Sequence, residues 1–94
     1  MDEAVVKRIM PHSNEAEQAV IGSMMMDQEA ITVAMEKLSD ADFYNKQYGS
    51  LFKAMVELYN EGREGDLVTI KTKLEEMDVP SEVISIDFIR NILD

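Results

Sequence analysis

The side chains that could carry out nucleophilic, metal or acid–base chemistry are few in this sequence. His12 is the single histidine, and it lies in a polar Pro-His-Ser-Asn turn without a second histidine or any cysteine as a partner. A histidine in such a turn is more typical of a solvated loop than of a metal ligand or a general base. The absence of cysteine excludes thiolate zinc sites and disulfides, and it fits a cytoplasmic location.

The carboxylates do not form a catalytic pair. Glu15, Glu17, Glu29 and the Glu75-Glu76 pair are interpreted as solvated charges or as residues of helix caps and first turns. None of them has the apolar sequence surroundings that tune a carboxyl group to act as a general acid. Acid–base catalysis is therefore not expected.

The glycines do not form a phosphate-binding loop. None of the four lies in a G-x-x-x-x-G-K-[ST] or a G-x-G-x-x-G pattern, the two arrangements that cradle phosphates. We therefore expect this chain to have no catalytic residues, no metal and no cofactor, and not to hydrolyse ATP.

Length and charge narrow the class of protein further. A chain of 94 residues is one small domain with marginal stability, which self-association would increase. Nineteen acidic against nine basic residues give a formal charge of −10, which repels phosphate backbones and anionic membranes. No apolar stretch approaches the ~20 residues of a membrane span, and the N-terminus lacks the pattern of a signal peptide. Direct binding to nucleic acid or membrane is not expected.

The spacing of apolar residues predicts an all-α fold, a compact orthogonal bundle of about five to six short helices. Helices are expected at about 15–26, 28–38, 46–61 and 67–77, and in a last segment over about 81–94. In that last segment a strand is the alternative, because Ile84, Ile86 and Phe88 alternate as well.

Capping residues predict where the helices begin and end. Asn14, with Glu17 three positions later, fits a capping box, and further N-caps are expected at Asp27, Asp66 and Ser81. Gly62 suits the position just after the longest helix.

The core is predicted from the longest helix and its neighbours. The turn at 39–42 is expected to deliver Phe43 and Tyr44 to the interior. The other predicted core residues are Phe52, Met55, Tyr59, Ile70 and Leu74.

The helix at about 15–26 is apolar on two sides. One arc comprises Ala16, Ala19, Val20, Ser23, Met24 and Met26. Ile21 and Met25 project about 100° or more from the centre of that arc. Gly22 lowers helix stability relative to alanine, and close approach of another backbone would compensate for this cost. We therefore expect Ile21, Gly22 and Met25 to contact a partner or a second copy. The alternative is a tightly packed monomeric core with methionines as flexible fillers.

The segment PHSNEAEQAVIGS, residues 11–23, resembles the opening signature of the N-terminal domain of DnaB-type replicative DNA helicases. Further matches are Asp27, Asp42-Phe43-Tyr44, Phe52-x-Ala54-Met55 and Gly62 followed by Asp66-Leu67-Val68-Thr69. The resemblance runs over about residues 11–77 without gaps. The family's Gly-Gly-x-x-Tyr-Leu step is absent, and Phe88-Ile89 stands in place of its Tyr-Leu pair.

The resemblance implies a domain organisation. Residues 1–10 would be a flexible or frayed leader, and residues 11–94 the globular head of the helicase N-terminal domain, cut before a helical hairpin. The ATPase domain, which binds ATP and Mg in this family, would lie outside the chain. Phe88 and Ile89 would then lie near the hairpin junction, which makes them further candidates for contact with a partner.

The resemblance also implies a role in DNA replication. In this family the N-terminal domains pair into dimers within a hexameric collar, which recruits the C-terminal domain of primase and takes part in control by a helicase loader. The setting would be the bacterial cytoplasm or nucleoid, or a phage-encoded system.

Two other classes of protein are weighed against this interpretation. A free-standing acidic helical adaptor or regulator would use the same surfaces to bind another protein. A small helix-turn-helix DNA-binding protein is disfavoured, because residues 67–77 hold only Lys71 and Lys73 against Glu75 and Glu76.

Overall fold

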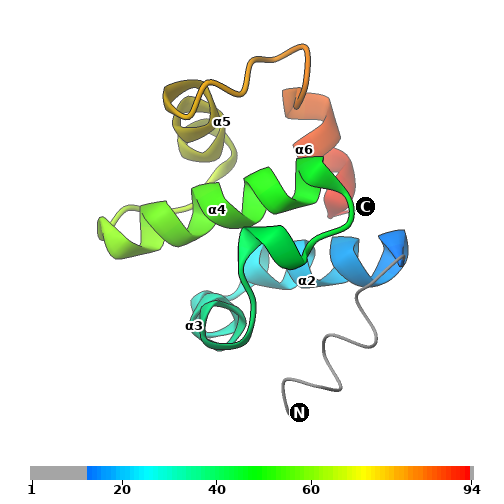
Figure 1. Ribbon diagram of the computed structural model, residues 1–94. Coiled ribbons are helices and arrows are strands. Elements are labelled where there is room, and N and C mark those ends of the chain that lie inside the picture. The colour runs from blue at the N-terminus through cyan, green and yellow to red at the C-terminus, as the bar shows by residue number, and fades with distance from the viewer. Residues whose placement is uncertain (1–12, 94) are drawn as a thin grey trace.

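Helix α4 (Lys46–Asn60) runs through the middle of the molecule, and the other elements pack around it (Figure 1). The computed structural model describes residues 13–93, so the expected leader at 1–10 lies outside the described residues. The remaining elements are α2 (Asn14–Met26), α3 (Gln28–Lys37), the 3-10 turn η1 (Asp40–Asp42), α5 (Leu67–Glu76) and α6 (Ile86–Ile92). Within the described part of the chain there are helices and no strand, which confirms the predicted all-α fold.

The elements form a compact bundle on both sides of α4. Helices α2 and α3 pack on one side of α4, and α5 packs on the opposite side (Figure 1). The short helix α6 contacts both α2 and α5, so it closes one end of the bundle. The first and last described helices are therefore neighbours in space.

Helix α4 supplies much of the core. Its buried apolar side chains are Tyr48, Leu51, Phe52, Ala54, Met55 and Leu58. They recur with helical spacing, and Lys53 and Asn60 on the other side are exposed. The predicted core residues Phe52, Met55, Ile70 and Leu74 are confirmed, and Tyr59 packs against the core while partly buried.

Gly49 allows η1 to pack closely against α4. A Cβ atom at this position would lie 2.9 Å from the backbone oxygen of Asp40, which is closer than carbon and oxygen can approach without displacement. Asp40 belongs to η1, and that backbone leads directly to Phe43, which packs on Phe52 with ring centroids 5.2 Å apart. Glycine at position 49 therefore keeps the aromatic pair within reach of the core.

Two helices end in a residue with left-handed backbone conformation. Gly62 follows α4 with φ of +72°, as predicted, and Asp78 follows α5 with φ of +64°. After α5 the N–H of Val79 donates back to the oxygen of Leu74 at 2.8 Å, which satisfies a carbonyl of the last turn. Both positions thus have the left-handed conformation, which glycine adopts without strain and aspartate adopts more readily than most other residues.

The N-cap of α2 differs from the prediction. The side chain of Ser13, not that of Asn14, accepts the N–H of Ala16 at 3.2 Å. Glu17 does not form the expected capping box because its side chain is buried elsewhere. The caps predicted at Asp27 and Asp66 are confirmed, since each carboxylate accepts a backbone N–H of the helix that follows.

The last helix begins later than predicted. The hydroxyl of Ser85 accepts the N–H of Phe88 at 3.0 Å, so Ser85 and not Ser81 is the N-cap of α6. Residues 81–84 form turns in which the oxygen of Pro80 accepts two backbone N–H groups, and Ile84 is buried ahead of the helix. The prediction of a helix from Ser81 is wrong, and so is the strand alternative.

The turn before α4 buries one aromatic ring rather than two. Phe43 is in the core, whereas Tyr44 is 70% exposed. Phe43 has extended backbone directly after η1, and Tyr44 lies in the bend that follows and leads into α4. The prediction of a core position therefore holds for Phe43 and is wrong for Tyr44.

Candidate interaction surface

The side of α2 that faces the protein interior contains Ile21. Its side chain is completely buried, as is that of Ile89 on α6, and Met24 lies beside them in the core. The prediction that Ile21 and Ile89 contact a partner is therefore wrong, because neither side chain reaches the surface. Helix α2 packs on α4 and α6 through the side that carries Ile21, and much of the opposite arc faces solvent.

Glu17 occupies the same inward side of α2, four residues before Ile21. Only 1% of its surface is exposed, and its two carboxylate oxygens accept the backbone N–H groups of Tyr44 at 2.7 Å and Asn45 at 3.0 Å. These hydrogen bonds satisfy a buried charge with backbone dipoles just ahead of α4. The interpretation of Glu17 as a solvated charge is therefore wrong, although its spacing with Ile21 and Met24 is that of one helix face.

Gly22 faces α6 of the same chain. A Cβ atom at Gly22 would lie 3.7 Å from Cγ2 and 3.8 Å from the backbone oxygen of Ile92, which is ordinary van der Waals contact. The element that lies beside Gly22 is therefore α6 of the same chain. The distance between them would also allow alanine at this position.

Two further candidates are partly buried. Met25 packs against the core and lines a shallow recess beside Tyr59 and Arg63. Phe88 packs against Tyr48 with ring centroids 5.7 Å apart. Each side chain keeps some contact with solvent, so partner contact at Met25 and Phe88 remains a prediction.

The outward side of α2 borders two grooves that the sequence did not predict. The α2–α3 groove has a volume of about 480 Å³ and is lined mainly by small and apolar side chains, among them Ala19, Ser23, Ala30 and Val33. The α2–α6 groove, of about 380 Å³, lies on the other side of Ala19 and Ser23 and includes Leu93. Two short side chains of α2, those of Ala19 and Ser23, line both grooves.

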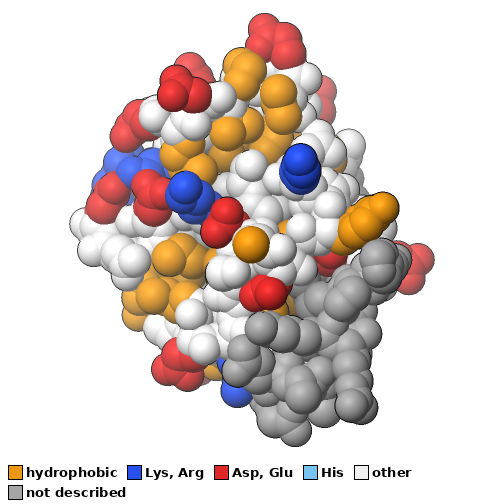
Figure 2. Space-filling view, viewed as in Figure 1, with side chains coloured by type: hydrophobic (Ala, Val, Ile, Leu, Met, Phe, Trp, Pro, Cys, Tyr) orange, Lys and Arg blue, Asp and Glu red, His pale blue; other side chains and the backbone are white. Residues whose placement is uncertain are grey.

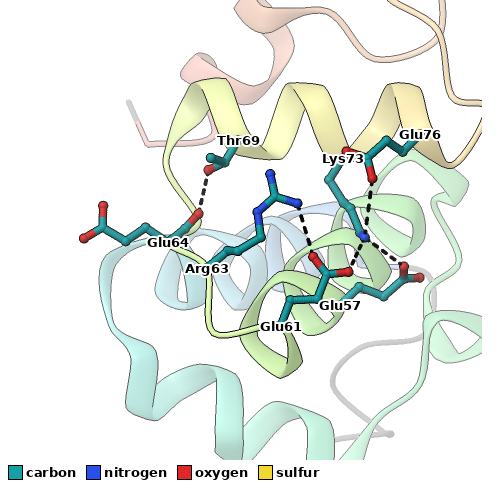
Figure 3. Close-up of polar contacts among 7 residues, drawn as sticks. All are labelled: Glu57, Glu61, Arg63, Glu64, Thr69, Lys73 and Glu76. Carbon is teal, nitrogen blue, oxygen red and sulfur yellow. Dashed lines mark hydrogen bonds and ion pairs between the residues drawn. The ribbon is translucent and has the colours of Figure 1, made fainter.

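A cluster of charged side chains joins the end of α4 to α5 (Figure 3). The Nζ atom of Lys73 lies 2.6 Å from Oε2 of Glu61, 3.5 Å from Oε1 of Glu57 and 3.9 Å from Oε1 of Glu76. The hydrogen bond from Lys73 lowers the pKa of Glu61, and the same bond raises the pKa of Lys73. Each partner thus holds the other in its charged form, which suits a structural link rather than proton transfer.

Lys71, two residues before Lys73, is buried without such partners. Its side chain is 8% exposed, and its Nζ atom has no hydrogen-bond acceptor among the described residues. An ammonium group in this state lowers stability, because its lost hydration is not replaced.

Figure 2 shows how charge is distributed over one face of the molecule. Lys and Arg side chains gather where α4 ends beside α5, and acidic side chains lie among them, in the middle of the face and along its edges (Figure 2). Between residues 13 and 93 no group of three His, Cys, Asp or Glu side chains is arranged to hold a metal ion. No helix in that range has the length and apolar character needed to cross a bilayer.

Residues 9–94 match a family model described as the DnaB-like helicase N-terminal domain. The chain belongs to this family. The match covers most of the sequence and confirms the resemblance carried by residues 11–77. The family assignment extends to the C-terminal end, where the Gly-Gly step is missing.

Replicative helicases are similar to this DnaB-like chain over nearly its whole length. The replicative DNA helicase DnaC of Bacillus subtilis is 35% identical over 92 residues, which are 98% of this chain and 20% of that protein. The replicative DNA helicase DnaB of Geobacillus stearothermophilus is 34% identical over 94 residues, which are 100% of this chain and 21% of that protein. The chain thus spans about a fifth of the length of these relatives.

A solved DnaB structure has the same fold. The crystal structure of the N-terminal domain of DnaB helicase from Mycobacterium tuberculosis matches with a TM-score of 0.81 and 26% sequence identity. The match covers 89% of this chain and 58% of the solved one. The DnaB-like chain therefore corresponds to somewhat more than half of that N-terminal domain structure.

Proposed function

We propose that this chain is the non-catalytic head of the N-terminal domain of a replicative DNA helicase. In this role it supports assembly of the helicase collar, through dimers that build a hexamer, and recruits the C-terminal domain of primase and the helicase loader. The observation that carries the proposal is the match of residues 9–94 to the helicase N-terminal domain family, together with the fold shared with a DnaB N-terminal domain.

The chemistry of the chain supports a protein-binding role. Its formal charge of −10 opposes contact with DNA, and carboxylates such as those of Asp27 and Glu61 are engaged in a helix cap and an ion pair. Unwinding, ATP and Mg would belong to the ATPase domain of the complete helicase, in the bacterial cytoplasm. The chain alone would then hydrolyse no ATP.

Calorimetric titration with the C-terminal domain of the cognate primase tests the recruitment role. The titration is run on the 94-residue chain and on the complete helicase, and an ATPase assay is run on both. We expect saturable binding by both proteins and ATP hydrolysis by the complete helicase alone. A lack of binding by the complete helicase would refute primase recruitment, and binding by that protein alone would place the contact outside this chain.

The downstream reading frame separates this proposal from a free-standing adaptor. A frame that continues into an ATPase domain supports the helicase, and a stop directly after Asp94 supports the adaptor. Light scattering of the 94-residue chain measures self-association, which the collar role requires of the complete protein.

A further inference from the structure

The α2–α3 groove has a floor of small side chains. Ala19 and Ser23 line it from α2, and Ala30 and Ala34 line it from α3, each pair spaced four residues apart on its helix. Residues four apart lie on one face of a helix, so both helices present short side chains to the same groove. The distance between packed helices depends on the side chains at the contact, and short ones allow close approach. The groove therefore suits a third helix.

The walls of the groove are apolar and reach the solvent. Val20 and Leu38 line it, and Val33 is 53% exposed beside them. A continuous apolar patch with a polar rim is characteristic of an interaction site, whereas single exposed apolar residues are common everywhere. The ten residues of α3 run for about 15 Å, which accommodates about three turns of a bound helix.

The two helices that form the groove are strongly acidic on their outer sides. They and their connection expose four carboxylates, those of Glu15, Asp27, Glu29 and Glu36, against the single basic side chain of Lys37. Asp27 and Glu29 line the groove near the beginning of α3, and Lys37 lines it at the opposite end of that helix. The groove thus has an acidic end and a basic end.

This charge distribution discriminates between occupants. A second copy of the chain that used the same face would bring its own Asp27 and Glu29 to this acidic surface, where like charges repel. A helix with lysine or arginine beside its apolar stripe would meet opposite charge at the end of the groove lined by Asp27 and Glu29.

We propose that the α2–α3 groove binds an amphipathic helix of another protein, with small or apolar residues facing Ala19 and Ala30 and basic residues beside them. The basic residues lie at the end marked by Asp27 and Glu29, which fixes the direction of the bound helix. Recognition follows the helix-in-groove mode, with anchors at i, i+3 or i+4, and i+7. The inference names the docking surface and the partner chemistry for the recruitment role, and it rests on the proposed function.

The test uses a synthetic peptide with a leucine and alanine stripe and lysine flanks, labelled for fluorescence anisotropy. Ala19→Arg places a long cationic side chain in the groove from an exposed helical position. Thr72→Arg, at an exposed position of α5, is the matched control. We expect at least about tenfold weaker binding for Ala19→Arg, unchanged binding for Thr72→Arg, and native circular dichroism for both, since a tenfold change corresponds to about 1.4 kcal/mol.

Charge is tested separately from shape. Glu29→Lys is expected to weaken binding of the lysine-flanked peptide several-fold, and a peptide with the same apolar stripe and glutamate flanks is expected to bind more weakly to the unaltered chain. Equal binding of both peptides, or equal affinity of the Ala19→Arg and unaltered chains, would overturn the proposal. Light scattering that shows a dimer abolished by Ala19→Arg would overturn it as well, because the groove would then serve a second copy.

A parallel titration with the C-terminal domain of primase, using the complete helicase, distinguishes failure of this inference from failure of the proposed function. Primase binding that Ala19→Arg leaves unchanged would preserve recruitment and refute the groove as its site. Peptide binding in the groove without primase binding would preserve the docking surface and refute primase as the partner.

Discussion

Helices α2 and α4 pack against each other, but they divide polar and apolar side chains differently. Helix α4 buries its apolar side and exposes Lys53 and Asn60. Helix α2 buries the carboxylate of Glu17 and exposes Met26, which is 79% accessible. The apolar side of α4 is covered by other elements of this chain, whereas α2 keeps apolar side chains exposed on its outer side. This difference supports the proposal that the outer side of α2 contributes to a docking surface.

The interior glycines of the two helices differ in the same way. A Cβ atom at Gly49 of α4 would collide with the backbone of Asp40, and one at Gly22 of α2 would only touch Ile92. The packing at Gly49 thus has no room for an added carbon atom, whereas the packing at Gly22 does. Four sets of substitutions follow, from the largest expected effect to the smallest.

Truncation of the inward side of α2 is expected to have the largest effect. Ile21→Ala removes a fully buried side chain and should lower the free energy of unfolding by about 2 to 5 kcal/mol. Urea denaturation followed by circular dichroism measures the change. Met26→Ala on the outward side is the control and should shift stability by less than about 0.5 kcal/mol. Similar losses for the two variants would remove the distinction between the sides of α2.

Removal of the buried carboxylate is expected to rank second. Glu17→Ala takes away the acceptor that Glu17 supplies to the N–H groups of Tyr44 and Asn45, at a cost of about 2 to 3 kcal/mol. Faster amide hydrogen exchange at these two residues would locate the loss at the beginning of α4. Glu15→Ala, at an exposed position of the same helix, should leave both stability and exchange nearly unchanged. Unaltered exchange at residues 44 and 45 would argue against this role of Glu17.

The glycine pair is expected to give effects of opposite sign. Gly49→Ala should destabilise the domain by about 1 to 2 kcal/mol, because the added carbon must displace η1. Gly22→Ala should stabilise it by up to about 1 kcal/mol, because alanine favours the helix and the space accepts its Cβ atom. Thermal unfolding of both variants under one set of conditions compares them directly. A loss of stability in Gly22→Ala would show that α6 cannot accommodate the added carbon.

The smallest expected effect concerns the charged cluster between α4 and α5. Lys73 lowers the pKa of Glu61 below its usual 4.5, so their interaction stabilises the fold above that value and is lost as the pH falls through the lowered pKa. Stability should therefore decline less between pH 7 and pH 3 in Glu61→Gln than in the unaltered chain. Urea midpoints at the two pH values measure this, preferably at low salt because Glu61 is partly exposed.

Glu64→Gln is the matched control for the pH experiment. Glu64 contacts Thr69 through its backbone oxygen, as Figure 3 shows, so the substitution leaves that hydrogen bond in place. Its acid decline should equal that of the unaltered chain. An equal decline in Glu61→Gln would mean that the cluster adds nothing measurable to pH-dependent stability.

The sequence predicted α4 well because one apolar arc and one polar arc leave a single way to bury the helix. The sequence did not show which side of α2 is buried, because this helix has two apolar arcs. Contacts with residues distant along the chain determine which arc faces the core. The amide of Gln18 donates to the oxygen of Ile92, which lies 74 positions away, at 3.4 Å. The buried position of Glu17 likewise depends on backbone N–H groups ahead of α4.

Two of the residues predicted to contact a partner were misplaced for the same reason, because local sequence patterns do not show which side of a helix is buried. Ile21 and Ile89 were assigned to a partner surface on the strength of local patterns, and both are core residues. The grooves were missed because Ala19 and Ser23 are short, and short side chains give little signal about which way they face. The family, by contrast, could be identified from the order and spacing of the motifs, which do not depend on which side is buried.

The exposed thioether of Met26 makes the outer side of α2 sensitive to oxidation. Met24 and Met55 are each 2% exposed, so peroxide should reach Met26 well before them. The sulfoxide product is polar and chiral, and it would convert an apolar edge of the α2–α6 groove into a hydrated one. Methionine sulfoxide reductases reverse this change, so the surface beside that groove can be switched chemically without any change in sequence.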